Sequence, residues 1–153
     1  MPNRVRPDRN VDDLVTAAMA KLQASQPADA EKILRRALRK APNDLNANNL
    51  IGVLLLNGGR AKEATRHLNQ AAKADPENAA ILDNLGVALS LAGDIEAGIT
   101  TLRRAVALAP ERTEFKIDLG KALADGGHAD EAIDSYRAVL SGEPSNVTAL
   151  NNL

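Results

Sequence analysis

Two histidines, His67 and His128, carry the only imidazole rings of the chain and are therefore the first candidates for acid–base or metal chemistry. Neither has a partner at the spacing of a metal site or a catalytic pair. The chain has no cysteine, which excludes disulfides, thiolate ligands and thiol nucleophiles. No phosphate-binding glycine loop or Ser-His-Asp order is present. We predict that the chain is not an enzyme and has no catalytic residue, metal site or cofactor.

A second set of polar residues points to recognition instead. Asn84, Asp118 and Asn152 follow one another at a constant interval, and each stands directly before a leucine. An amide donates and accepts hydrogen bonds simultaneously, whereas an ionised Asp118 only accepts. A row of such groups can hold the backbone of an extended peptide. The alternative, that these polar residues only keep a surface soluble, stays open.

The same interval organises nearly the whole chain. It separates four prolines, three glycines within apolar segments and three glycines in polar turns: Pro42, Pro76, Pro110 and Pro144; Gly52, Gly86 and Gly120; Gly59, Gly93 and Gly127. The hydrophobic content of 44% comes mostly from Ala, Leu, Val and Ile, with one Phe and one Tyr, which suits closely packed helices. We therefore predict an all-α fold.

This pattern resembles the tetratricopeptide repeat family, whose repeat is about 34 residues long. The repeats would span 11–44, 45–78, 79–112 and 113–146, with a partial fifth at 147–153, after a basic N-terminal tail at 1–10. The resemblance implies an α-solenoid in which each repeat is an antiparallel pair, helix A and helix B. In this family the pairs stack into a right-handed superhelix, and the A helices line a concave groove that holds peptide segments of partner proteins.

Particular residues have physical roles in such a repeat. Small residues on both helices allow close approach: Ala18, Gly52, Gly86 and Gly120 on helix A, and Ala30, Ala64, Gly98 and Ala132 on helix B. The turn glycines are expected to take positive φ, and each proline to follow the end of helix B. Asp44, Asn78 and Asn146 are expected to cap the next helix A. Asn48 and Lys116 stand where the family prefers a large apolar residue.

Six positions of each helix A fall opposite the buried stripe, because they step by three or four residues. Over four repeats they hold five acids and one lysine, which predicts an acidic groove: Asp12, Asp83, Glu114, Asp118 and Asp125 against Lys121. The peptide-binding candidates are Asn49, Val53, Asp83, Asn84, Val87, Glu114, Asp118, Lys121 and Asn152.

Two ligand modes of the family can be compared with these residues. The clamp for a C-terminal carboxylate of chaperone tails is rejected, because Glu114 and Asp118 stand where it needs cations. The row of Asn84, Asp118 and Asn152 is similar to the asparagine ladder of protein O-glycosyltransferases. In the second repeat Leu50 interrupts this row, with Asn49 one residue early.

The leading interpretation is a scaffold that binds a basic or hydroxyl-bearing segment of a partner protein. The alternative is the substrate-recruiting N-terminal region of a larger glycosyltransferase or sulfotransferase, with its catalytic domain outside this chain. A net charge of −1 gives no long-range attraction to nucleic acid or an anionic membrane. Without a secretory signal or a membrane-length apolar run, we expect a cytoplasmic location.

Both ends carry further predictions. We expect the partial repeat to place Val147, Leu150 and Leu153 against the last helix B, and its uncapped surface to permit end-to-end self-association. The cationic N-terminal tail should be attracted to the acidic groove.

Overall fold

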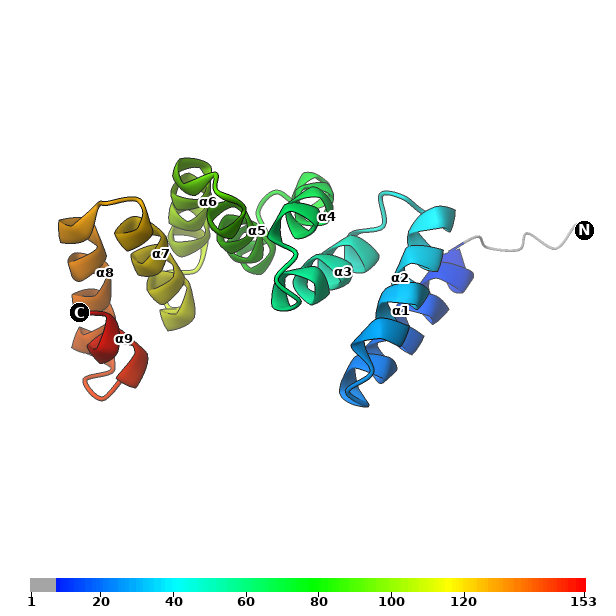
Figure 1. The fold of residues 1–153 in the computed structure, drawn as a ribbon, viewed down its shortest axis with the longest axis horizontal. Coiled ribbons are helices and arrows are strands. Elements are labelled where there is room, and N and C mark those ends of the chain that lie inside the picture. Colours follow the sequence, from blue (N-terminus) through cyan, green and yellow to red (C-terminus); the bar gives the residue numbers. More distant parts are fainter. Residues whose placement is uncertain (1–7) are drawn as a thin grey trace, which may run out of the picture. The chain divides into compact units, whose positions relative to one another are not determined.

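The structure is a computed structural model that describes the backbone of residues 8–153 and the side chains of residues 10–153. Within this range the chain forms nine α-helices and no strand, which confirms the all-α prediction (Figure 1). In chain order they are α1 (Asp8–Gln23), α2 (Pro27–Lys40), α3 (Leu45–Asn57), α4 (Ala61–Ala74), α5 (Ala79–Ala92), α6 (Ile95–Leu108), α7 (Thr113–Asp125), α8 (Ala129–Gly142) and α9 (Val147–Asn152).

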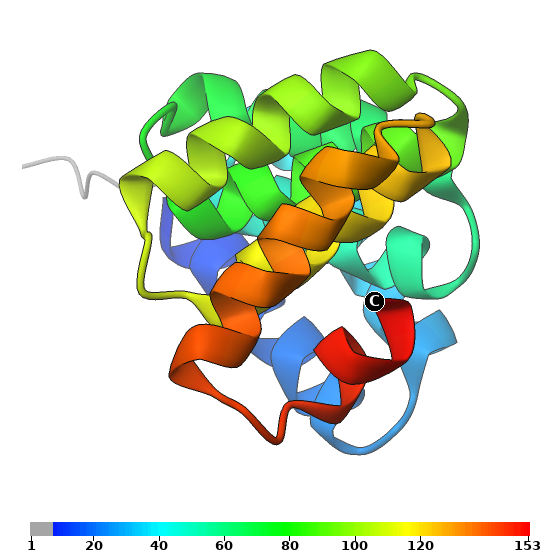
Figure 2. The same ribbon diagram turned by 90° about the vertical axis from the view of Figure 1, so that its left-hand side faces the viewer.

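The chain forms two compact units, which divide between Ala74 and Asp75. The first holds the pairs α1–α2 and α3–α4, with α2 against α3. The second holds the pairs α5–α6 and α7–α8, with α6 against α7. There α7 also contacts both α5 and α9, and Figure 2 shows the loop that leads from α8, in orange, into α9, in red. The predicted helix pairs are confirmed, with α9 as the start of a further helix A.

Helix α1 begins at Asp8, inside the segment that we assigned to the basic tail. The side chains of Arg4, Arg6 and Arg9, which would attract the tail to a groove, lie outside the described residues. Docking of the tail therefore stays a prediction.

The turns within the pairs have the predicted backbone. Gly59, Gly93 and Gly127 have φ values of 73°, 100° and 81°, and Ser25, with φ 56°, takes the same place in the first pair. Each helix B ends two residues before its proline, at Lys40, Ala74, Leu108 and Gly142. Three helices A start with a side-chain cap: Asp44, Asn78 and Asn146 accept a hydrogen bond from the backbone N–H three residues later.

Helices A and B approach one another through glycine. A Cβ atom at Gly52 or at Gly86 would stand 2.5 Å from Cγ of the facing leucine, Leu68 or Leu102. At Gly120 it would stand 2.6 Å from Cε1 of Tyr136. The space that a side chain would occupy is filled by the large residue of helix B, and this explains the small residue of helix A.

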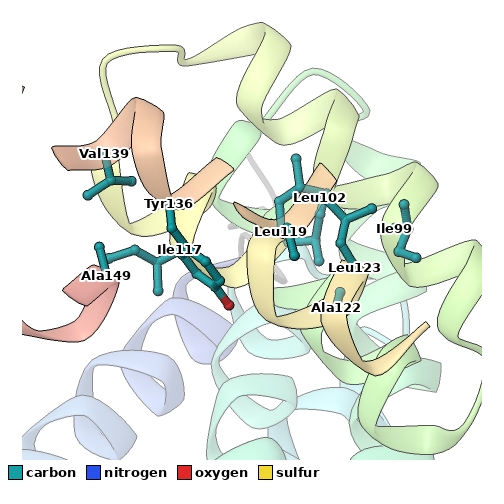
Figure 3. Packing of buried hydrophobic residues seen from close by; sticks show 10 residues of the cluster. Ile99, Leu102, Ile117, Leu119, Ala122, Leu123, Tyr136, Val139 and Ala149 are labelled. Carbon is teal, nitrogen blue, oxygen red and sulfur yellow. The ribbon is translucent and has the colours of Figure 1, made fainter. Parts of the chain in front are cut away.

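The core of the second unit is a continuous apolar cluster. Leu102, Leu123 and Tyr136 are buried between the helices of the two pairs. Figure 3 shows Tyr136 and Ile117 on the side of the cluster where α9 adds Ala149. In the first unit the largest fully buried apolar side chains are Leu34, Ile51, Leu55 and Leu68.

The partial repeat packs through a different residue from those that we predicted to be buried. Val147, Leu150 and Leu153 are exposed, at 67%, 52% and 55%, while Ala149 is fully buried. Helix α9 has only six residues, so it places one small side chain in the core and leaves its larger apolar side chains in solvent.

Asn48 is 1% exposed although it is polar. Its Nδ2 atom donates to the carbonyl oxygens of Pro42 and Asp44, both at 2.9 Å. Its Oδ1 atom lies 3.0 Å from Nδ1 of His67 on α4. The family's apolar contact is replaced here by a buried hydrogen-bond network.

Candidate functional site

In the second unit, the face of α5 and α7 is hollowed by a cavity of about 250 Å³, which we call the α5–α7 cavity. It brings together three of the predicted residues, Val87, Asp118 and Lys121. The rest of its lining is Ser90, Leu91, Leu102, Ala122 and Asp125. Apolar walls with a few charged groups are the usual composition of a binding pocket.

The charges of this face include one cation, Arg112, that the predicted balance did not count. Lys121 donates to Asp118 at 3.1 Å, and the guanidinium of Arg112 donates to Glu114. The Arg112 guanidinium also lies 4.7 Å from the centre of the Phe115 ring and lowers the pKa of the Glu114 carboxyl through its hydrogen bond. Because Arg112 precedes helix A, the predicted groove positions did not include it. The predicted charge balance therefore missed this cation, while Asp118 and Asp125 still outnumber Lys121 in the lining of the α5–α7 cavity.

Asp83 was predicted to be an accessible groove acid, and this is wrong. Its side chain is 7% exposed, and its Oδ1 atom has no hydrogen-bond partner among the described residues. Burial, together with the charges of Asp118 and Glu114, raises the pKa of Asp83 to about 7. Near neutral pH this residue is thus partly uncharged and supplies little attraction to a cationic ligand.

In the first unit, the face of α1 and α3 holds a second cavity of about 410 Å³, the α1–α3 cavity. Its lining combines apolar, amide and acidic groups: Asp12, Val15, Thr16, Met19, Asn46, Asn49 and Leu50. The Oδ1 atom of Asn49 is buried without a hydrogen-bond donor among the described residues. Asn49 and Asp83 occupy the same position of successive repeats, so this position holds an unpartnered buried oxygen in both units.

The remaining predicted residues line neither cavity. Val53 and Asn84 are half-buried on α3 and α5, and Asn152 is exposed at the end of α9. Asn84, Asp118 and Asn152 nevertheless lie on α5, α7 and α9, and α7 contacts both of the other helices.

Five residues that line the α5–α7 cavity were not among the nine candidates, and Leu91 and Asp125 are two of them. Leu91 is 64% exposed and Asp125 is exposed. Both stand at the last of the groove-facing positions of helix A, one repeat apart; Asp125 was counted there among the groove acids, and the same register could have identified Leu91.

The histidines have structural partners. His67 contacts Asn48, as described above, and Nε2 of His128 lies 3.0 Å from a carboxylate oxygen of Glu96. Among the described residues no three His, Cys, Asp or Glu side chains are grouped as metal ligands would be. No described helix has both the length and the apolar character needed to cross a membrane.

The fold and the repeat identify the class of protein. The family model of the tetratricopeptide repeat matches residues 15–79, 59–113 and 117–153. The chain therefore belongs to the tetratricopeptide repeat family. No curated protein matches the chain.

Solved structures share this fold. A crystal structure of the MamA protein has a TM-score of 0.85 at 22% identity, covering 94% of this chain and 78% of that chain. MamA from Desulfovibrio magneticus RS-1 has a TM-score of 0.83 at 24% identity, covering 93% and 79%. YrrB, described as a TPR protein with an unusual peptide-binding site, has a TM-score of 0.79 at 25% identity, covering 91% and 72%.

Proposed function

We propose that this chain is a non-catalytic protein-interaction module whose A-helix faces bind an extended segment of a partner protein. The observation that carries the proposal is the buried, unpartnered Oδ1 atom of Asn49, a residue that lines the α1–α3 cavity. A buried acceptor without a donor costs free energy, and a peptide N–H group supplies such a donor.

The row of Asn84, Asp118 and Asn152 supports the same mode of binding. These residues lie on α5, α7 and α9, which contact one another in that order. Hydrogen bonds from such a row to a peptide backbone are independent of side-chain identity.

The carboxylates that line the cavities favour basic or hydroxyl-bearing segments. Asp12 lines the α1–α3 cavity, and Asp118 and Asp125 line the α5–α7 cavity. Acidic segments would meet like charges at both places and should bind poorly. YrrB, which has the same fold, is described as having an unusual peptide-binding site, and this adds support to peptide recognition.

The test is binding of an array of unrelated extended peptides to the wild type and to the variants Asn49→Ala and Asn84→Ala. Each variant should weaken all binding peptides by a similar factor, on the order of 1 kcal/mol per lost hydrogen bond. Asn69→Ala, the same change at an exposed residue of α4, is the control and should leave binding unchanged. A preference for acidic peptides, or indifference to both groove variants, would place the binding site elsewhere.

A further inference from the structure

The size of the α5–α7 cavity suits one side chain rather than a free small molecule. Its volume is about 250 Å³, whereas ligand pockets are typically about 300–1,000 Å³. A cavity of this size in a peptide-binding face would select the residue that the peptide places there.

The interior of the α5–α7 cavity is apolar. Leu102 and Ala122 are buried core residues, and Val87 on α5 is half-buried. Leu91 is 64% exposed beside them, so a ligand that covers it removes apolar surface from water. These groups would contact an aliphatic chain.

The charged part of the cavity lining is acidic, and one of its two carboxylates has no partner among the described residues. Asp118 is already bonded to Lys121 at 3.1 Å. Asp125 forms no ion pair and no side-chain hydrogen bond with the described residues, so its carboxylate is available. The hydroxyl of Ser90 donates to the carbonyl oxygen of Gly86 and is therefore occupied.

We propose that the α5–α7 cavity binds a lysine or arginine side chain of the partner segment, with its aliphatic stem against Val87, Leu91 and Ala122 and its cationic head on Asp125. This inference rests on the proposed function, which it makes specific at one position of the ligand. A lysine or arginine has an apolar stem and a charged end, so it can contact both the apolar side chains and the carboxylate of the lining. A neutral apolar side chain gains the stem contacts alone, and an acidic one is repelled.

Lys121 competes with the ligand for the same carboxylates. It is half-exposed on α7, and its ammonium group neutralises Asp118 and repels an incoming cation. Removing this charge should strengthen the binding of a basic side chain. That increase is an unusual outcome for a substitution in a binding site, so it distinguishes the proposal from general damage.

The experiment is an NMR titration of the full chain with peptides of one alanine–serine host sequence that carry Lys, Arg, norleucine or Glu at one central position. n-Butylguanidinium serves as a probe of the cavity without a peptide backbone. The amides of Val87, Leu91 and Ala122 should shift with the Lys and Arg peptides. Asp125→Asn should weaken these peptides by roughly two- to fivefold, towards the norleucine level, and Lys121→Met should tighten them by a similar factor.

Asp134→Asn is the matched control, because it removes the same charge from an exposed residue of α8 and should change nothing. If norleucine binds as well as lysine and Asp125→Asn has no effect, the cavity is only apolar, and the inference is wrong while the proposed function stands. If no peptide binds but n-butylguanidinium shifts the same amides and depends on Asp125, the cavity recognises a cationic alkyl group, as inferred, but peptide binding, which is the proposed function, is wrong. If neither probe binds, both are wrong.

Discussion

The Nδ1 atom of His67 lies 3.0 Å from the Oδ1 atom of Asn48, and this contact determines which nitrogen of the imidazole ring carries the proton. The Nδ2 atom of Asn48 faces the carbonyl oxygens of Pro42 and Asp44, so the orientation of the amide is determined by its donors. Its oxygen can then only accept, and neutral His67 must carry its proton on Nδ1. Side chains of helices A and B are thus joined by a bond of known direction.

Asn48 should be required for stability in its amide form. Asn48→Asp replaces the donor by an oxygen that faces two carbonyl oxygens, and we expect it to lower the free energy of unfolding by about 2–4 kcal/mol in urea denaturation. Asn43→Asp is the control, because Oδ1 of Asn43 accepts from Gln70 at an exposed site and the acceptor is retained. Its effect should stay within about 0.5 kcal/mol. Equal losses in the two variants would contradict the network.

His67 should titrate below its ordinary value of 6.5. Burial, with the positive charges of Arg35 and Arg66, lowers the pKa of His67. The unfolded state then binds more protons near and below pH 6.5, so this residue contributes stability at higher pH that is lost as the pH falls through this range. NMR titration should give the lowered pKa, and the ring nitrogen shifts should give the Nδ1–H tautomer. The Nε2–H tautomer would disprove the assigned bond direction.

Asp83 should have the opposite effect on the pH dependence of stability. Its pKa is raised from 3.8 to about 7, so between these values the folded state binds more protons than the unfolded state. The stability that it contributes is present below pH 3.8 and is lost as the pH rises through about 7. Asp83→Asn should therefore be more stable than the wild type at pH 8, with a difference that shrinks towards pH 5. Urea denaturation at several pH values measures this difference, with Asp134→Asn as the control. If the free energies of unfolding of the wild type and Asp83→Asn change with pH in parallel, the raised pKa is refuted.

Gly98 should not tolerate a side chain. A Cβ atom at this position would stand 2.8 Å from the carbonyl oxygen of Gly86 and 3.0 Å from the backbone nitrogen of Ser90, so helices α5 and α6 would have to separate. We expect Gly98→Ala to lower the free energy of unfolding by about 1–3 kcal/mol. Gly142→Ala meets no atom within 4 Å and should stay within about 0.5 kcal/mol. If Gly98→Ala leaves the free energy of unfolding unchanged, helices α5 and α6 can separate without loss of stability, and this prediction is wrong.

Helix α9 should cause concentration-dependent association. Val147, Leu150 and Leu153 present apolar surface to water, which a second copy of the chain can cover. Light scattering across a concentration series should detect association in the wild type and a marked reduction in the double variant Val147→Lys, Leu150→Lys. A strictly monomeric wild type at high concentration would rule this out.

The periodicity of the sequence determined much of the local structure by itself. The spacing of Pro42, Pro76, Pro110 and Pro144 located the ends of the B helices, and the turn glycines identified the residues with positive φ. These features depend on backbone sterics within a few residues, so the local sequence is sufficient to predict them.

The tertiary structure decided how far each side chain is covered and which charges are paired. Asp83 and Asp118 both stood at predicted groove positions, but the first is buried with an unpartnered oxygen and the second is joined to Lys121. Helical spacing places a residue on a face, whereas its exposure depends on the side chains of neighbouring helices that lie far away in the sequence. For the same reason Ala149, rather than its larger neighbours, fills the core beside Tyr136.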